Sequence, residues 1–440
     1  MTESTTVNFY DGVMGVGKTT YIIEYARSHA TPLVIASPLL SEVEGRIAAE
    51  TGFWTPRKDS PPKSAQLLEA LRDGRNVVIS HALLDHLDSK HHLALVQHGY
   101  KLILDEVKDS VLEPIGLKND ALRLLLRAEA IEVGEDSRIQ WLESPTFTEY
   151  TELRDAALKD TAYAVDSTPA KAVAVADYAL YAAFLEIDVY TYMAPFSLMW
   201  QYFQIAPRFG PFRFDVKHHE VRGGVDGLYI SHAPPVYSGL PFAHLVEVDH
   251  SPKRDLMYTE NLSLSATGYK GMRKPQFEAL GSATRGFFKA SEGFAGKLKR
   301  MYTVPKEQKE KIIPKEGKEV FDISHFVPVN ARATNLHAKR TALAYLSDFH
   351  PHPSVIALLT QCGVEIGSRS PTQQSFYAGF SLSNMLQWIW RSAIRNGEPI
   401  RVYIPSPRMR ALFRGWLEEG FPVPIHARPA AQYVPNALAA

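Results

Sequence analysis

The chain has 440 residues, 45% of them hydrophobic and 22% charged, which is typical of a globular protein of two or three domains. Its single cysteine, Cys362, excludes an intrachain disulfide and a cysteine-rich zinc site and fits a reducing compartment. No apolar run is long enough to span a bilayer, and the N-terminus lacks the pattern of a signal segment. We therefore expect a cytoplasmic protein with no membrane partner.

The net charge of zero hides an asymmetry between the two halves of the chain. Residues 1–250 hold 22 basic and 34 acidic side chains, a net charge of −12, whereas residues 251–440 hold 26 and 14, a net charge of +12. A basic second half is typical of a protein that contacts a polyanion such as nucleic acid. The alternative is a pair of solvated faces that attract each other.

A glycine-rich segment near the N-terminus predicts a nucleotide site. Residues 12–20 read G-V-M-G-V-G-K-T-T and satisfy the phosphate-loop pattern G-x-x-x-x-G-K-[ST] at every fixed position. The run 7–10 before them is typical of a strand, and a helix is expected to begin near Lys18. In such a loop, backbone amides and the helix N-terminus bind phosphates, the lysine reaches the β- and γ-phosphates, and the threonine hydroxyl binds Mg²⁺. The predicted nucleotide-binding residues are Gly12, Gly15, Val16, Gly17, Lys18, Thr19 and Thr20.

Three further apolar runs predict the rest of a parallel sheet. Residues 33–36 and 77–79 are short buried-type strands, and residues 101–106 form a strand that ends in Asp105 and Glu106. Strands that alternate with helical segments favour a mostly parallel sheet with ligands at its carboxyl end. We expect Asp105 to hold Mg²⁺ together with Thr19, and Glu106 to polarise the attacking water. The expected cofactors are ATP and Mg²⁺.

Composition divides the remaining chain into an insertion, a basic segment and a second compact unit. The insertion is acidic and largely helical, and the strand-like residues 187–192 follow it. Lysines repeat from Lys297 to Lys318, as in a mobile linker or exposed arm. Strands are expected at 326–329 and 401–404 of the second unit. The predicted domains are an N-terminal ATPase lobe 1–250 with its insertion at about 107–185, a basic linker or accessory segment 251–325, and a C-terminal lobe 326–440.

A predicted helix over residues 382–395 carries the most informative polar side chains of the second unit. Gln387, Arg391 and Arg395 are spaced four residues apart, so they would share one helix face opposite an apolar stripe. Arginines that reach the γ-phosphate from a second lobe neutralise charge in the transition state. We therefore place all three residues in the catalytic set with Glu106. The alternative is an amphipathic surface helix whose polar face happens to be basic.

Taken together, these segments resemble helicases of superfamilies 1 and 2, and most of all phage-encoded DEAD/DEAH-type members. The resemblance implies an α/β fold of two RecA-like P-loop NTPase lobes, with a mostly parallel sheet, a helical insertion and a basic linker. It also implies that the helix with Gln387 senses the nucleotide. The nucleic-acid contacts that it implies are Ser37, Pro38, Ser80, His81, Thr334 and Asn335. The segments that carry it are 12–20, 35–40, 77–82, 102–107, 331–335, 387–395 and 403–410.

Several features depart from the family pattern. Asp105 and Glu106 are followed by Val-Lys rather than by Ala-Asp or Ala-His. Arg391 and Arg395 are four residues apart, whereas superfamily 2 helicases usually place these arginines three residues apart. Ser265-Ala266-Thr267 matches the motif that couples ATP hydrolysis to movement in many helicases, but it lies just before the basic segment. Thr191, in the expected strand 187–192, is the competing candidate, and we favour it slightly.

Three functions remain open from the sequence. The first is an ATP-dependent translocase or helicase that acts on single-stranded or forked DNA, in phage DNA replication or recombination. The second is a viral DNA-packaging ATPase, for which the scarce acids after residue 325 offer little material for a nuclease. The third is a P-loop switch without motor activity. We expect the first, in the host cytoplasm if the protein is viral, with replication or packaging proteins as possible partners.

Overall fold

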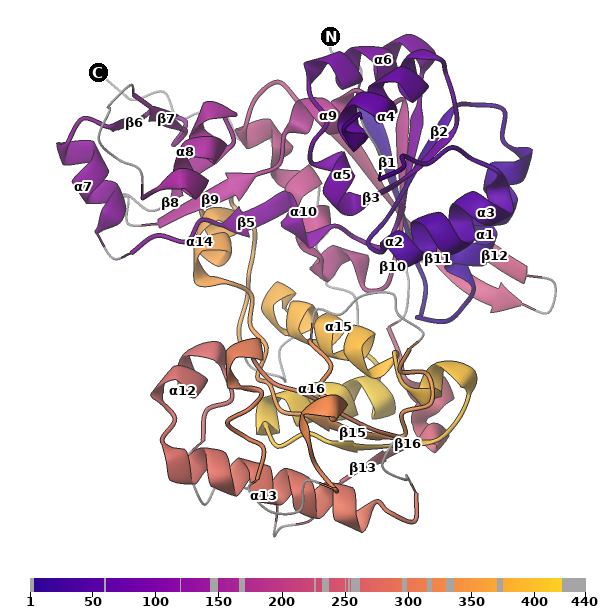
Figure 1. Ribbon diagram of the computed structural model, residues 1–440, viewed down its shortest axis with the longest axis vertical. Coiled ribbons are helices and arrows are strands. Elements are labelled where there is room, and N and C mark those ends of the chain that lie inside the picture. The colour runs from indigo at the N-terminus through magenta and orange to yellow at the C-terminus, as the bar shows by residue number, and fades with distance from the viewer. Residues whose placement is uncertain are drawn as a thin grey trace.

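The computed structural model describes residues 4–58, 61–118, 120–142, 149–165, 171–224, 227–231, 237–249, 251, 254, 262–294, 299–314, 319–329, 336–369 and 375–421. Figure 1 shows two α/β bodies, one above the other, with the insertion beside the upper one. We call the body built on a seven-stranded sheet the first lobe and the body built on a four-stranded sheet the second lobe.

The first lobe is built on a sheet in the order β12-β11-β1-β10-β4-β2-β3, in which only β12 is antiparallel to its neighbour. Its inner strands are short apolar runs buried along most of their length, as expected for a sheet covered on both faces. The strands predicted at 7–10, 33–36, 77–79, 101–106 and 187–192 are confirmed. The bounds are β1 Thr5–Asp11, β2 Leu33–Ser37, β3 Val77–Ser80, β4 Lys101–Asp105, β10 Glu186–Thr191, β11 Phe214–Gly224 and β12 Gly227–Ser231.

Alternate side chains of this sheet enter two different hydrophobic cores, because successive residues of a strand point to opposite faces. Leu33, Ile35 and Ile103 pack under α1 and the π-helical turn after β2, whereas Val34 and Leu102 belong to the large core on the other face. Helices therefore cover both sides of the sheet (Figure 1). Their bounds are α1 Lys18–Ser28, α2 Leu40–Glu42, the π-helix Val43–Ile47, α3 Ala48–Thr51, α4 Lys63–Arg72, α5 His81–Leu84, α6 Ser89–His98, α9 Tyr178–Ala182 and α10 Leu198–Ile205.

The insertion between β4 and β10 is a mixed α/β body, so the prediction of a largely helical segment is wrong. Its alternating short runs, such as Lys-Ala-Val-Ala-Val at 171–175, pair as strands in two small antiparallel sheets, β5-β9-β8 and β6-β7. The bounds are β5 Leu112–Pro114, α7 Ala121–Arg127, β6 Ile131–Val133, β7 Ile139–Trp141, α8 Thr151–Leu158, β8 Ala162–Val165 and β9 Lys171–Val175.

The second lobe carries an all-parallel sheet in the order β13-β16-β15-β14. The strand predicted at 401–404 is confirmed as β16. The predicted strand at 326–329 is wrong, since Phe326 makes a single bridge to Tyr302. The bounds are β13 Val246–Val248, α12 Ala266–Gly271, α13 Lys274–Ala290, β14 Arg300–Thr303, β15 Ala342–Tyr345, α14 Pro353–Gln361, α15 Phe376–Ile389, β16 Ile400–Tyr403 and α16 Pro407–Glu418.

The sheet of the second lobe also corrects the predicted linker. Strand β13 lies within the segment assigned to the first lobe, and β14 and α13 lie within the segment 251–325 assigned to a linker. Arg300 is 3% exposed, and the other three residues of β14 are buried. The lysine-rich flanks hide this strand in the sequence, because it is only four residues long and two of these, Arg300 and Thr303, are polar.

The lobes pack directly on one another through α15. A Cβ at Gly379 in this helix would lie 2.1 Å from the ring of Phe196, which follows β10 in the first lobe. In addition, Val355 and Leu358 of α14 belong to the large core of the first lobe, and this helix packs on β9 of the insertion. The α/β class with largely parallel sheets is confirmed. No helix in the described ranges is long and apolar enough to cross a membrane.

Candidate nucleotide site

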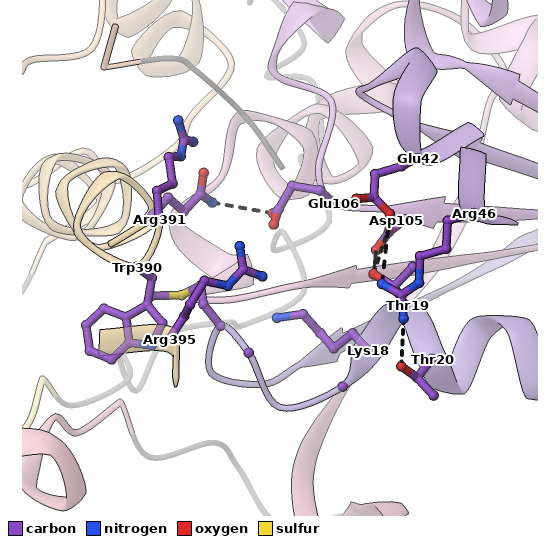
Figure 2. Close-up of a pocket in the computed structure, with 14 residues that line it drawn as sticks. Lys18, Thr19, Thr20, Glu42, Arg46, Asp105, Glu106, Trp390, Arg391 and Arg395 are labelled. Carbon is purple, nitrogen blue, oxygen red and sulfur yellow. Dashed lines mark hydrogen bonds and ion pairs between the residues drawn. The ribbon is translucent and has the colours of Figure 1, made fainter. Parts of the chain in front are cut away.

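A cavity of about 320 Å³ lies where the phosphate loop of the first lobe faces the end of α15 in the second (Figure 2). It contains every charged residue that the sequence predicted for catalysis or metal binding. Its lining residues are Met14, Gly15, Gly17, Lys18, Thr19, Thr20, Glu42, Arg46, Asp105, Glu106, Gln387, Trp390, Arg391 and Arg395.

The loop itself has the conformation that its glycines predict. Gly15 and Gly17 have φ angles of +83° and +99°, in the left-handed region that side chains disfavour. Helix α1 begins at Lys18, as predicted, and runs for 11 residues. The first residues of this helix, Lys18, Thr19 and Thr20, line the cavity, and a helix N-terminus is a favourable place for an anion.

Lys18 lies within the loop and contacts its carbonyls. The ammonium donates hydrogen bonds to the carbonyl of Gly12 at 2.6 Å and to that of Thr191 at 3.1 Å. Burial lowers the pKa of Lys18, while Glu106, Asp11 and Asp105 oppose this effect. A polyphosphate would give this cation a better partner than neutral carbonyls.

Thr19 and Asp105 form the pair expected to hold Mg²⁺. The Thr19 hydroxyl donates to the Asp105 carboxylate, with oxygen distances of 3.1 and 3.2 Å. Burial, followed by the nearby Glu106, raises the pKa of Asp105 to about 6, and a divalent cation would favour the ionised carboxylate. Mg²⁺ takes one or two protein oxygens and completes its shell with phosphates and water, so this pair fits the ion. No group of three or more His, Cys, Asp or Glu side chains in the described ranges is arranged as a metal cage.

Glu106 occupies a strained position at the end of β4. Its φ angle is +94°, which is unfavourable for a residue with a side chain. Its Oε1 atom accepts hydrogen bonds from the Thr191 hydroxyl at 2.5 Å and from Gln387 Nε2 at 3.4 Å. The carboxylate is therefore held from β10 and from the second lobe at once.

The hydrogen bond from Thr191 to Glu106 distinguishes the two candidate coupling motifs. Thr191 touches Glu106 directly, whereas Ser265 lies at the start of α12, where its hydroxyl accepts from the amide of Gly268 at 3.0 Å. Ser265 thus caps a helix of the second lobe and does not line the cavity. These positions favour Thr191 for the coupling role.

Gln387, Arg391 and Arg395 line the cavity, but the single helix predicted for them is wrong. Helix α15 ends at Ile389, the chain then turns, and Arg395 lies in a separate 3-10 helix, Ala393–Asn396. The residues around the turn are buried, so tertiary packing overrides the helical periodicity. Arg391 is only 5% exposed, and burial lowers the pKa of Arg395. The arginines converge because the turn redirects the chain, not because they share a helix face.

Four of the residues expected to contact nucleic acid, Ser37, Pro38, Ser80 and His81, lie at or just beyond the carboxyl ends of β2 and β3. Ser37 is fully buried, which opposes a direct contact by this side chain. The Ser80 hydroxyl accepts from the amide of Leu83 and caps α5, whose first residue, His81, is buried. Pro38 is partly exposed. Thr334 and Asn335 lie outside the described residues.

Sequence reasoning missed four residues of the cavity wall: Met14, Glu42, Arg46 and Trp390. Glu42 and Arg46 follow β2 in a segment whose π-helical turn cannot be read from periodicity. Their spacing of four residues places Glu42 and Arg46 on one side of a helix, and this was the only sign of them in the sequence. Such pairs are, however, common on exposed helices.

Asp11, directly before the loop, was also missed. Its carboxylate is fully buried and accepts hydrogen bonds from the amides of Met193 and Ala194, each at 2.8 Å. It also accepts from the Tyr237 hydroxyl at 2.6 Å and lies 3.0 Å from His218 Nε2. Asp11 thus joins the loop strand, the end of β10 and a tyrosine that belongs to the core of the second lobe.

Asp11→Ala should destabilise the protein by roughly 3–5 kcal/mol, because it leaves several buried donors without an acceptor. Urea-induced unfolding, monitored by tyrosine and tryptophan fluorescence, measures the change. Tyr237→Phe removes one donor and keeps the carboxylate paired, so it should cost only about 1 kcal/mol. Equal losses in the two variants would contradict the central position of Asp11.

The fold and the cavity define a two-lobed α/β protein with a phosphate-loop site at the lobe junction. Residues 241–417 match the YonV C-terminal Rossmann-like domain family, and this match begins close to β13. Over 438 residues the chain is 24% identical to the SPbeta prophage-derived uncharacterized protein YonV of Bacillus subtilis (strain 168), an alignment that covers 94% of this chain and 98% of that protein.

Two solved structures are similar to the chain along most of its length. One is titled XPD_APO, with a TM-score of 0.45 and 9% identity over 91% of this chain and 92% of that chain. The other is the structure of S. tokodaii Xpd4, with a TM-score of 0.46 and 11% identity over 94% of this chain and 95% of that chain.

Proposed function

We propose that this protein is an ATP-dependent nucleic-acid translocase or helicase of phage origin. The observation that carries the proposal is the cavity at the lobe junction. The phosphate loop and the acids of β4 line one side, and Gln387, Arg391 and Arg395 line the other. The prophage-derived relative supports the phage origin. The sequence resemblance to superfamily 1 and 2 helicases supports the motor activity.

In this proposal each residue has a defined part in hydrolysis. The loop amides and Lys18 bind the β- and γ-phosphates, and Glu106 orients the water and accepts its proton. Thr19 and Asp105 would hold Mg²⁺, which would supply positive charge to neutralise the phosphate oxygens. Arg391 and Arg395 stabilise charge on the transferred group from the second lobe. The hydrogen bonds to Glu106 from Thr191 and Gln387 keep its carboxylate in place.

Strand β10 offers a route from the nucleotide to the second lobe. Thr191 contacts Glu106, and the next residue, Tyr192, contacts two helices of the second lobe. Its carbonyl accepts from the Ser383 hydroxyl at 3.4 Å, and its hydroxyl accepts from Trp416 Nε1 at 3.0 Å. A change at Glu106 on hydrolysis would therefore reach α15 and α16 within two residues. This is the coupling that a two-lobed motor requires.

We further propose that the nucleic acid is a single strand or a fork that contacts Pro38 and the turn at Ser80 as well as the basic second lobe. Its binding should weaken with salt, with a logarithmic slope of about −0.7 per neutralised phosphate of a single strand.

The deciding experiment measures ATP turnover with single-stranded DNA, duplex DNA and RNA, each across a salt series. We expect single-stranded DNA to stimulate turnover and the stimulation to fall steeply with salt. Stimulation by duplex DNA alone would favour a packaging ATPase. Turnover unaffected by every nucleic acid would favour a P-loop switch without motor activity.

A further inference from the structure

Arg46 occupies the first-lobe wall of the cavity at the end away from the second-lobe arginines. It belongs to the π-helical turn Val43–Ile47, a conformation often found at functional sites. Its Nη2 atom donates to the Thr20 hydroxyl at 2.9 Å. Figure 2 shows Arg46 beside Thr20, with Lys18 between it and Arg395. The phosphate loop thus lies between cations from two lobes.

The ion pairs of Arg46 do not account for this position. Glu42 and Glu50 lie 3.9 and 3.4 Å from its guanidinium nitrogens, and its side chain is 38% exposed. Exposed pairs of this kind contribute little to stability and exchange readily with other partners. The guanidinium is therefore able to turn from Thr20 toward a ligand without a large loss in folding free energy.

The electrostatics of the cavity favour an anion between the two walls. Burial lowers the pKa of Arg395; Glu42 opposes that shift and Arg46 adds to it. Arg46 and Arg395 therefore repel each other across the cavity. A polyphosphate placed between them would relieve this repulsion, and guanidinium groups bind phosphate oxygens through two parallel hydrogen bonds.

We propose that Arg46 binds the phosphates that ATP and ADP share, whereas Arg391 and Arg395 respond to the γ-phosphate. Lys18 reaches the β- and γ-phosphates, so a cation at Thr20, further along α1, faces the α-phosphate end of the nucleotide. This inference rests on the proposed function. It assigns a role to Arg46, which lies outside the sequence motifs that support that function. The inference distinguishes the two walls of the cavity. Substitution of Arg46 would weaken the binding of ADP, whereas substitution of Arg391 or Arg395 would change it little.

The test compares equilibrium binding of fluorescent N-methylanthraniloyl ADP and of the same label on a non-hydrolysable ATP analogue. Arg46→Ala should weaken both by a similar factor, about tenfold or more, as for a lost hydrogen bond to a charged group. Arg46→Lys should recover part of the affinity. Arg27→Ala is the matched control. Arg27 also contacts Glu50, since its Nη2 atom donates to the backbone carbonyl of Glu50 at 2.7 Å, but Arg27 does not line the cavity.

The outcomes separate this inference from the function on which it rests. Unchanged affinity of Arg46→Ala for both probes, or an equal loss in Arg27→Ala, would overturn the role of Arg46 alone. A loss confined to the ATP analogue would move Arg46 to the γ-phosphate and also overturn it. If the wild-type protein bound neither probe, the proposed function would fail as well. Thermal unfolding without nucleotide checks that each variant is folded.

Discussion

Lys18→Ala should abolish ATP hydrolysis, and Glu106→Gln should stop turnover while preserving ATP binding. The Lys18→Ala substitution removes the one cation that the phosphate loop itself supplies to the β- and γ-phosphates, so both affinity and rate should fall. The glutamine keeps the shape of the side chain, and its amide oxygen still accepts from Thr191, but it has lost the base. We therefore expect Glu106→Gln to hold ATP in an unhydrolysed complex.

Binding of a labelled ATP and release of phosphate, measured separately, distinguish the two variants. Glu44→Gln is a suitable control, because Glu44 is exposed, pairs with Lys63 at 3.8 Å and lies outside the cavity. It should behave as the wild type. If Glu106→Gln loses ATP affinity as severely as Lys18→Ala, Glu106 has a structural role and the assignment of the base is wrong.

Arg391→Ala and Arg395→Ala should each lower the turnover number by roughly 10³–10⁵, the range seen when an arginine finger is removed. The affinity for ADP should change by no more than a few-fold, because neither side chain is needed without a γ-phosphate. The physical reason is that these arginines act on charge that develops during phosphoryl transfer. Steady-state turnover and ADP titration give the two quantities.

Two controls keep this result interpretable. Arg391 is nearly buried, so Arg391→Lys, which keeps the charge but not the planar fork, should fold and still be slow. Lys289 is exposed at the end of α13, outside the cavity, and Lys289→Ala should have wild-type turnover. Unchanged turnover in both alanine variants would mean that neither arginine takes part in hydrolysis.

The sequence by itself determined the phosphate loop, the parallel strands around it and the acids of β4. These features are local: φ angles above zero at Gly15 and Gly17 favour glycine, and a strand buried on both faces is rich in apolar residues. The loop between β1 and α1 brings Thr19 next to the carboxyl end of β4, which is separated from β1 by β10 and carries Asp105.

Only the tertiary structure decided how the second lobe is built and how it reaches the cavity. Strand β14 is four residues long within a lysine-rich run, so its membership of the sheet depends on partners far along the chain. Helix α15 ends before Arg391 because buried packing outweighs periodicity, and the turn still brings Arg391 and Arg395 to the loop. Arg46 and the hydrogen bonds of Asp11 depend in the same way on long-range contacts, for which a single sequence carries no periodic signal.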